Sequence, residues 1–339
     1  MHEAYKPMAS YRILVVTNLW PTEADPGFGS FVKAQMESLR PLGVEFDVLF
    51  INGRESTWNY LRGIRRVRRQ LRAKSYDLIH AHFGLSGWVA RWQWRVPLVV
   101  SFMGDDVLGK PGRSGRLTLR GYFLRISGFI LARLVSTVIV KAPQMAAKLR
   151  MPSAHVIPNG VDLNLFRPIE QSEAREKLGL NADKKFALFP YDRDEPRKRF
   201  DLIQAAVALA RERVPKLELL VAHGKPQEQV PPYMNAADVL VMASTFEGSP
   251  NAVKEAMATN LPVVAVDVGD VKELIGTTEG CFLVSRDAAE IAEKIVEVCR
   301  RGGRTNGRDR IQKLSMEAVA QQIVKIYAET LGRPPDPSR

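Results

Sequence analysis

Two glutamates, Glu247 and Glu255, stand eight positions apart across a glycine, a proline and the start of an apolar-periodic segment. Ser249 is a candidate N-cap and Pro250 a candidate first helical residue, so Glu255 should lie inside a helix and Glu247 on the loop before it. Free amides at a helix start suit an anion, whereas carboxylates suit hydroxyls, at ~1.5–3 kcal/mol per charged hydrogen bond. The pattern predicts a site for a ligand that carries both, such as a nucleotide sugar.

The surroundings of this pair resemble a known signature. Residues 246–257 read FEGSPNAVKEAM and continue through residues 258–271 as ATNLPVVAVDVGDV. This text closely resembles the donor site of family 4 of the retaining glycosyltransferases, and most of all that of bacterial enzymes of cell-surface polysaccharide assembly, such as the teichuronic-acid group. Matches extend to residues 77–82, to the hinge at residues 159–162 and to the last helix. Without them, two glutamates near a helix start would be read as surface charges that compensate a helix dipole.

The resemblance implies roles for the residues around the pair. Glu247 would engage sugar hydroxyls and Glu255 the ribose diol. The loop between them would hold the diphosphate or the sugar, which makes donor-binding residues of Gly248, Ser249, Pro250 and Asn251. Attack is expected on the front face of the sugar, with the leaving phosphate helping to deprotonate the acceptor, so no protein nucleophile is expected.

Residues 191–201 resemble the family's Arg/Lys pair, which neutralises the departing diphosphate. We assign Arg193 and Lys198 to this role, with Arg197 as the alternative because the spacing here varies among relatives. A solvated charge run before a helix would look similar. One cation ~4 Å from a phosphate, at an effective dielectric near 20, contributes ~4 kcal/mol, or roughly a thousandfold in rate, which could replace a metal ion.

Two glycine-bearing loops in the first half are expected on the acceptor or sugar side. Gly27 and Gly29 lie in the loop after the first strand, where they permit close approach of backbone to a ligand. Gly104 and Asp106 belong to a segment that resembles the family's His-Gly-x-Asp loop. Met103 stands where that loop usually has its histidine, which helps position the donor sugar.

No metal ion and no cofactor are expected. Asp105 and Asp106 form one adjacent pair without further ligands nearby. His80 and His82 end a candidate strand, and we expect their rings on opposite faces, which would exclude a shared metal.

The elements that must position these residues follow an alternation of short apolar runs with longer helical patterns, which predicts α/β structure with parallel sheets. The resemblance implies the GT-B form, with two Rossmann-like domains facing an interdomain cleft. We expect an acceptor domain over residues 1–166, a donor domain over 167–314, and a last helix over 315–331 that packs back on the first domain. The candidate strands are residues 12–17, 45–51, 78–82, 98–102, 137–141, 155–157, 186–190, 217–222, 239–242, 263–266 and 281–284.

Composition limits the function classes. The chain has 339 residues, of which 45% are apolar, enough for two cores. It has no run of the ~18 apolar residues that span a bilayer, and its first residues lack the apolar core of a signal peptide. We therefore expect a cytoplasmic protein.

The net charge of +12 points to anionic partners. Residues 62–74 hold seven cations and no acid around an apolar stripe, and residues 110–133 form a second basic, apolar stretch. Peripheral contact with the inner face of an anionic membrane, through the Arg62–Lys74 helix, is the working hypothesis; an ordinary peripheral helix is the alternative.

We therefore predict a retaining glycosyltransferase that uses a nucleoside-diphosphate sugar and a glycan or lipid-linked acceptor. The nucleobase stays open, because relatives usually build part of its pocket from an additional β/α unit where this chain has only residues 224–230. A sugar-nucleotide epimerase of the same fold is one alternative. A nucleic-acid binder is another, but the arginine clusters lack the exposed aromatics that stack on bases, so no nucleic acid is expected as a partner.

Overall fold

The computed structural model describes residues 10–109 and 117–333. Contacts divide the chain into two compact units. Unit 1 contains residues up to Ala24, then Phe28–Gly160 and the chain from Met316 onward; unit 2 contains Asp25–Gly27 and Val161–Ser315. None of the helices in the described ranges is both long and apolar enough to cross a membrane.

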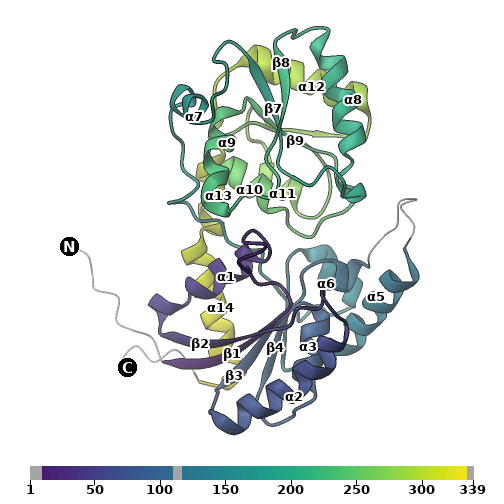
Figure 1. The fold of residues 1–339 in the computed structure, drawn as a ribbon, viewed down its shortest axis with the longest axis vertical. Helices are drawn as coiled ribbons and strands as arrows, with labels where there is room; N and C mark the ends of the chain where they lie inside the picture. The colour runs from purple at the N-terminus through teal and green to yellow at the C-terminus, as the bar shows by residue number, and fades with distance from the viewer. Residues whose placement is uncertain (1–9, 110–116, 334–339) are drawn as a thin grey trace, which may run out of the picture. The chain divides into compact units, whose positions relative to one another are not determined.

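Unit 1 is built on a six-stranded parallel sheet with the order β2-β1-β3-β4-β5-β6 (Figure 1). The strands Leu98–Ser101 and Thr137–Val140 are short runs rich in valine and isoleucine, as expected for strands covered on both faces. The strands are β1 (Tyr11–Thr17), β2 (Val44–Phe50), β3 (Leu78–His82), β4 (Leu98–Ser101), β5 (Thr137–Val140) and β6 (His155–Val156).

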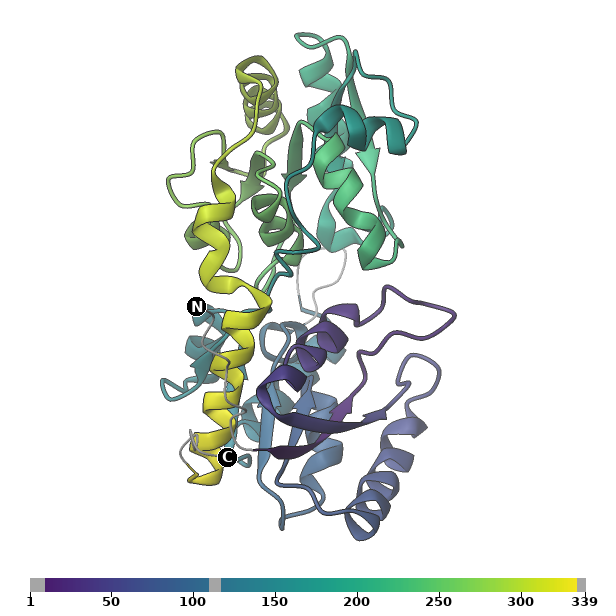
Figure 2. The same ribbon diagram turned by 90° about the vertical axis from the view of Figure 1, so that its left-hand side faces the viewer.

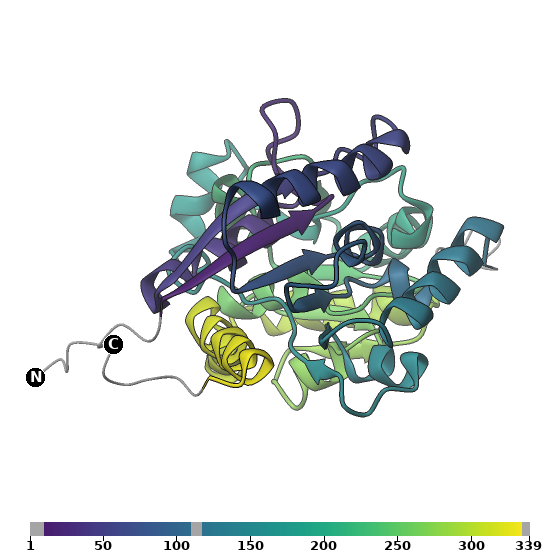
Figure 3. The same ribbon diagram turned by 90° about the horizontal axis from the view of Figure 1, so that it is seen from below.

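Helices cover both faces of this sheet. One face packs against α2 (Trp58–Ala73), α3 (Gly84–Arg91), α5 (Leu119–Leu131) and α6 (Pro143–Leu149). The other packs against α1 (Ser30–Glu37) and the last helix, α14 (Met316–Leu331). Figure 2 shows α14 in yellow along the strands of unit 1, and Figure 3 shows α2 across the sheet from it. A short helix, α4 (Asp105–Leu108), follows β4, and a 3-10 turn spans Arg40–Leu42.

Unit 2 has a five-stranded parallel sheet with the order β11-β10-β9-β7-β8. The chain moves one way along the sheet through α8 and the other way through α9, α10 and α11, so right-handed crossovers put α8 on the opposite face from those three. The strands are β7 (Lys185–Phe189), β8 (Leu217–Val221), β9 (Val239–Met242), β10 (Val263–Val266) and β11 (Phe282–Val284).

The helices of unit 2 complete its two layers, and α8 and α12 lie side by side in Figure 1. They are α7 (Gln171–Lys177), α8 (Phe200–Arg211), α9 (Val230–Ala236), α10 (Asn251–Ala258), α11 (Val271–Ile275), α12 (Ala288–Arg301) and α13 (Gly307–Ile311). The 3-10 turns are Pro196–Lys198, Gln227–Gln229 and Gln312–Leu314.

The predicted α/β class is confirmed, and each expected strand is found with ends that differ by at most one residue. Two boundaries differ from the expectation. The chain enters unit 2 at Val161, before the expected end of the first domain at residue 166, because Phe166 is fully buried in the core of unit 2. Gly27, expected in the first domain, is grouped with unit 2.

Candidate functional site

Three loops of unit 2 follow the carboxyl ends of β7, β9 and β10; they carry Glu247 and its cations, and the loop after β9 leads into α10, on which Glu255 lies. Ligands of parallel sheets bind beyond this edge. The backbone N–H of Thr245, after β9, donates to the carbonyl of Arg197, after β7, over 2.9 Å. Arg286 donates to the carbonyls of Ser244 and Thr245 from the other side. The loop that carries Glu247 is therefore tied to two neighbours.

Glu247 is held by two cations. Lys198 Nζ lies 2.6 Å from Oε1, and Arg197 Nη1 lies 3.1 Å from Oε2. The Glu247 side chain is 9% exposed. Burial acts to raise its pKa, but the charges of Lys198 and then Arg197 outweigh burial and hold the pKa below its usual value. Glu247 is therefore an ionised carboxylate at neutral pH.

The cations of this cluster keep donor capacity for an anion. Lysine has three N–H donors and arginine five, and the contacts with Glu247 use one of each. Lys198 Nζ also lies 3.7 Å from the ring centroid of Tyr191, and the Arg197 guanidinium lies 5.1 Å from that of Phe246. Two cations against one carboxylate leave a net positive charge, as a diphosphate site requires.

Arg193, one of the two cations assigned from the sequence, is not part of this cluster. It is exposed, and its guanidinium lies over the ring of Phe200, 5.4 Å from the centroid. The 3-10 turn Pro196–Lys198 explains the difference, because it directs the two adjacent cations at its end toward Glu247. Among the predicted cations, the structure brings together Lys198 and the alternative Arg197.

Helix α10 begins at Asn251, with Pro250 in extended conformation as the N-cap residue. The prediction that Ser249 caps this helix is wrong. Its hydroxyl accepts a hydrogen bond of 3.1 Å from Nζ of Lys254, a fully buried ammonium that needs polar partners. Ser249 therefore supports a buried charge beneath the start of the helix.

Glu255 lies on α10 and is partly buried. Burial raises its pKa to about 7, although the neighbouring Lys254 opposes the shift. Lys254 itself has a pKa lowered by burial to about 8, with Asp270 and Glu255 opposing. Burial also raises the pKa of Asp270, and Lys254 and Ser249 oppose it. Of these three groups, Glu255 and Lys254 have pKa values close to neutral pH, and Asp270 supplies the negative charge that opposes the shift of Lys254.

Lys254 and Asp270 were not among the predicted site residues. Both lie inside the segment that carries the family resemblance. Lysine is seldom fully buried unless it is paired, so no local pattern marks Lys254 as interior. A lysine directly before a glutamate on a helix reads as a surface residue, and only the packing of α10 shows otherwise.

Gly248 lies against the loop after β10. Gly269 there has a left-handed backbone with φ of 61°, and a Cβ on it would come within 2.3 Å of the Gly248 carbonyl oxygen. Only glycine permits this approach. This close contact fixes the distance between the loop that precedes α10 and the loop after β10, and so the position of the amides of the first loop.

Donor binding is expected to tighten about tenfold between pH 6 and pH 8 through Glu255. A carboxylate with a pKa of about 7 is mostly protonated at pH 6, and the ionised form is the better acceptor for ribose hydroxyls. The donor-free protein should instead lose stability as the pH rises from about 4.5 to 7, since its folded state holds this proton more tightly than the unfolded chain. Calorimetric titration with the donor, and unfolding at each pH, measure the two trends.

Glu255→Gln is the control for this pH dependence, because glutamine keeps the shape and does not titrate. Its affinity for the donor should vary much less over the same range. A wild-type affinity that does not change with pH, or an equal change in the variant, contradicts the assignment. Titration of Lys254 near pH 8 sets the upper limit of the useful range.

In unit 1, Asp106 organises the loops after β3 and β4. Its carboxylate accepts hydrogen bonds from the amides of Met103, Gly104 and Gly84, at distances of 2.8 to 3.1 Å. It is 1% exposed, and burial raises its pKa to about 6 against the pull of these amides. Asp106 therefore holds the backbone of both loops in place through these hydrogen bonds. Gly104, with φ of 139°, has free space where a Cβ would lie.

Gly29 packs against its own loop. It has φ of 72°, and a Cβ would come within 2.3 Å of the Leu19 carbonyl carbon. It caps α1 without a side-chain bond. The glycine is required by the turn that brings the chain from β1 into α1.

The expectation that His80 and His82 point to opposite faces is wrong, because residues two apart on a strand share a face. Their rings are stacked, with centroids 4.2 Å apart. His80 bonds to the hydroxyls of Tyr327 and Ser101, at 2.6 and 2.8 Å. Burial lowers the pKa of His80 to about 3 and that of His82 well below its usual value. Both are neutral core residues.

Within residues 10–109 and 117–333, no group of three or more His, Cys, Asp or Glu side chains is arranged to hold a metal ion.

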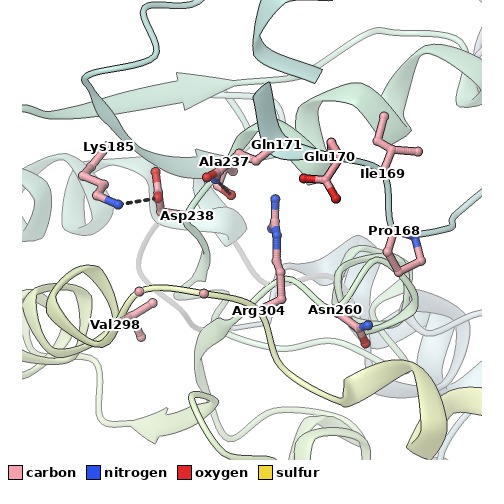
Figure 4. Close-up of a pocket in the computed structure, with 12 residues that line it drawn as sticks. Pro168, Ile169, Glu170, Gln171, Lys185, Ala237, Asp238, Asn260, Val298 and Arg304 are labelled. Atoms are coloured by element: carbon pink, nitrogen blue, oxygen red, sulfur yellow. Dashed lines mark hydrogen bonds and ion pairs between the residues drawn. The ribbon is translucent and has the colours of Figure 1, made fainter. Parts of the chain in front are cut away.

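A cavity of unit 2, of about 360 Å³, lies at the amino ends of β7 and β9, away from the glutamate pair (Figure 4). Lys185 pairs with Asp238 over 3.1 Å at its wall, and Arg304 projects between them and Glu170. Arg304 also donates to the carbonyl of Asn235. The cavity lies at the edge of the sheet opposite the loops that carry Glu247 and its cations, so it is separate from that cluster.

Comparison with known proteins agrees with this arrangement. Residues 9–160 match the model of the glycosyl transferase 4-like domain, and residues 202–301 match the model of glycosyl transferases group 1. Two parallel-sheet units of this kind make up the GT-B fold. The chain belongs to the family 4 glycosyltransferases, which confirms the resemblance seen in the sequence and identifies the protein as an enzyme of the transferase class.

Three similar proteins show how far the likeness reaches. The teichuronic acid biosynthesis glycosyltransferase TuaC of Bacillus subtilis is 26% identical, with 84% of this chain and 88% of that protein aligned. The sucrose-phosphate synthase of Thermosynechococcus elongatus has a TM-score of 0.79 at 23% identity and covers 96% of this chain and 100% of its own. HepE of Anabaena, in complex with UDP-glucose, has a TM-score of 0.66 at 19% identity over 94% of this chain and 100% of its own.

Proposed function

We propose that this protein is a retaining glycosyltransferase that moves a sugar from a nucleoside-diphosphate donor to a hydroxyl of a glycan or lipid-linked acceptor, without a bound metal ion. The observation that carries the proposal is the convergence of Arg197 and Lys198 on the buried carboxylate of Glu247, at the carboxyl edge of the unit 2 sheet. Two fixed cations can stabilise charge on a departing diphosphate where a metal ion would otherwise do so.

In this mechanism the bond between the anomeric carbon and the donor phosphate oxygen breaks, and its electrons stay on the phosphate. The acceptor hydroxyl oxygen forms the new bond on the same face of the sugar, and its proton passes to the leaving phosphate. Arg197 and Lys198 lie where they can offset the growing charge. Glu247 accepts from sugar hydroxyls, and Glu255 accepts from the ribose diol.

Unit 1 would bind the acceptor. The likeness to TuaC supports an acceptor of bacterial surface polysaccharide synthesis, and the UDP-glucose bound to HepE supports a uridine nucleotide as the first donor to try. Helix α2 carries a row of exposed arginines and no acid, and α5 also lacks acids, which supports work at an anionic membrane surface in the cytoplasm.

A panel of UDP-, GDP- and ADP-sugars tests the proposal by thermal unfolding and by slow donor hydrolysis. At a hundredfold excess over Kd, the cognate donor should add about 2.7 kcal/mol of stability, on the order of 5–10 °C in Tm for a unit of this size. Hydrolysis should proceed in EDTA, and the transferred sugar should keep its anomeric configuration by NMR.

The panel also separates the alternatives. Interconversion of the sugar with no transfer to any hydroxyl would indicate an epimerase of the same fold. No response to any donor, together with tight oligonucleotide binding, would contradict the proposed function. Inverted anomeric configuration would contradict the retaining mechanism alone.

A further inference from the structure

An apolar groove of about 440 Å³ lies on unit 1 between α2, α3 and α5. Its size falls in the range of small-molecule sites, roughly 300–1,000 Å³. The residues that line it are almost wholly apolar or aromatic, and they include Tyr60, Leu61, Trp88, Trp92, Phe123 and Ile126.

Much of this lining is exposed to solvent. Phe123 is 64% exposed, Ile126 and Trp92 are each 58% exposed, and Leu61 is 55% exposed. A contiguous patch of this kind on a folded domain marks an interaction site. Its members come from three helices that are far apart in the sequence, so the groove is a product of the fold and not of one amphipathic helix.

The flanks of the groove carry positive charge only. Neither Trp58–Ala73 nor Leu119–Leu131 contains an acidic residue, whereas α2 alone has six arginines. Arg68 donates to the carbonyl of Trp92, at 3.4 and 3.2 Å, and so lies at one end of the groove. An occupant must therefore combine an apolar body with negative charge.

A second copy of this chain fits these flanks poorly. A symmetric dimer would set the same arginine-bearing face against itself, and like charges that meet there would repel. An anionic lipid has the complementary pattern, because its hydrocarbon suits the lining and its phosphate suits the arginines.

The groove also has a direction. At one end the Tyr60 hydroxyl accepts a hydrogen bond of 2.9 Å from Asn18, in the loop after β1. Arg120 lies in the first turn of α5, and in a parallel sheet a helix that follows a strand begins at the carboxyl edge, so Arg120 belongs to the same end. This end lies at the carboxyl edge of the unit 1 sheet. The Trp92 end, after α3, lies at the opposite edge.

We propose that this groove binds one aliphatic chain of a phosphate-bearing lipid, with the phosphate at the Tyr60 and Arg120 end and the chain directed toward Trp92. The inference rests on the proposed function in one respect: the lipid is the carrier of the acceptor, whose sugar then lies beside the carboxyl-edge loops of unit 1. The arginines of α2 contact the membrane from which the chain is drawn.

The test uses dodecyl phosphate with a bromine at the chain end, below its critical micelle concentration, and the full chain without donor. Trp88 and Trp92 line the groove, so bromine in it should quench tryptophan fluorescence to saturation. Ile126→Glu and Phe123→Glu should weaken this binding at least about tenfold. Tyr122→Glu is the matched control, because Tyr122 is a 51% exposed residue of α5 outside the groove, and it should bind as the wild type does.

A second set of variants tests where the phosphate of the lipid binds. Arg120→Gln should weaken dodecyl phosphate by roughly tenfold and leave brominated dodecyl maltoside unchanged, while Arg69→Gln changes neither. Inorganic phosphate alone should not compete at equal concentration. Circular dichroism of each variant checks that it is folded.

Several results would overturn the proposal. They are an absence of saturable quenching, equal loss in Tyr122→Glu, equal affinity for the maltoside with no effect of Arg120→Gln, or a dimer that Phe123→Glu dissociates without lipid. The last result would mean that a second copy covers the groove.

Failure of the proposed function is distinguishable from failure of this inference. The donor panel and the alkyl probes share no ligand and no binding residue. Flotation with anionic phospholipid vesicles at low salt reports membrane contact separately, and replacing Arg65, Arg66, Arg68 and Arg69 by glutamate should abolish it. Saturable quenching with no donor response would remove the glycosyltransferase role and leave the lipid site.

Discussion

Replacing Lys198 with methionine is expected to reduce turnover about a thousandfold, the largest effect of any single change in the site. A cation ~4 Å from the leaving phosphate contributes ~4 kcal/mol at an effective dielectric near 20, and methionine keeps the length of the side chain without its charge. The ammonium of Lys198 is held in one position, because it pairs with Glu247 at 2.6 Å and lies over the face of the Tyr191 ring. Rates at saturating donor, with acceptor present, measure the loss.

Arg193→Met is the comparison for this variant. Arg193 is exposed and stacks over Phe200 instead of joining the cluster, so its loss should cost less than about tenfold. A larger loss at Arg193 than at Lys198 would return the role to the residue that the sequence first indicated. Arg197→Met should lie between the two, because its guanidinium contacts Glu247 at 3.1 Å from a more exposed position.

The two glutamates should separate binding from turnover. Glu255→Gln is expected to weaken donor binding by roughly ten- to a hundredfold, as loss of charged hydrogen bonds to the ribose diol implies. Glu247→Ala is expected to lower kcat by about a hundredfold and to leave donor affinity equal or tighter. The alanine removes a sugar contact and the alignment of two cations, but it leaves those cations near the diphosphate without their counter-charge.

Donor Kd by calorimetry and kcat by product formation decide between these effects. A drop in donor affinity on Glu247→Ala, equal to that of Glu255→Gln, would show that Glu247 serves binding alone. If neither change affected either quantity, neither acid would belong to the donor site. The double variant should show that the two losses combine if, as proposed, the acids contact different parts of one ligand.

The ion pairs of Glu247 also set the acid limit of the site. The folded-state pKa of Glu247 is below the usual value for a glutamate. The ion pairs therefore stabilise the protein at any pH above that usual value, and this stabilisation is lost as the pH falls through the folded-state pKa. Glu255 behaves in the opposite sense, because burial raises its pKa to about 7. The different environments of the two carboxylates explain why only one of them titrates near neutral pH.

The sequence predicted the sheet elements closely because many of the strands are short apolar runs, as in 263–266, between segments of helical period. It also predicted that Glu247 and Glu255 lie on a loop and a helix, since glycine and proline between them mark the boundary. The choice between Arg193 and Arg197 was out of its reach. The direction of each side chain depends on a 3-10 turn and on a carboxylate fifty residues away.

By itself, then, the sequence determined the α/β class, the strands, the family and the acids of the donor loop. These follow from local period and from residue types at short spacing. Only the tertiary structure decided which cations meet Glu247, that Lys254 is buried against Ser249, that His80 and His82 stack in a core, and that α2, α3 and α5 form a groove. Each of these depends on contacts between segments that are distant in the sequence. Such contacts are selected by the free energy of burial in the folded protein, and a local sequence pattern does not reveal which segments will meet.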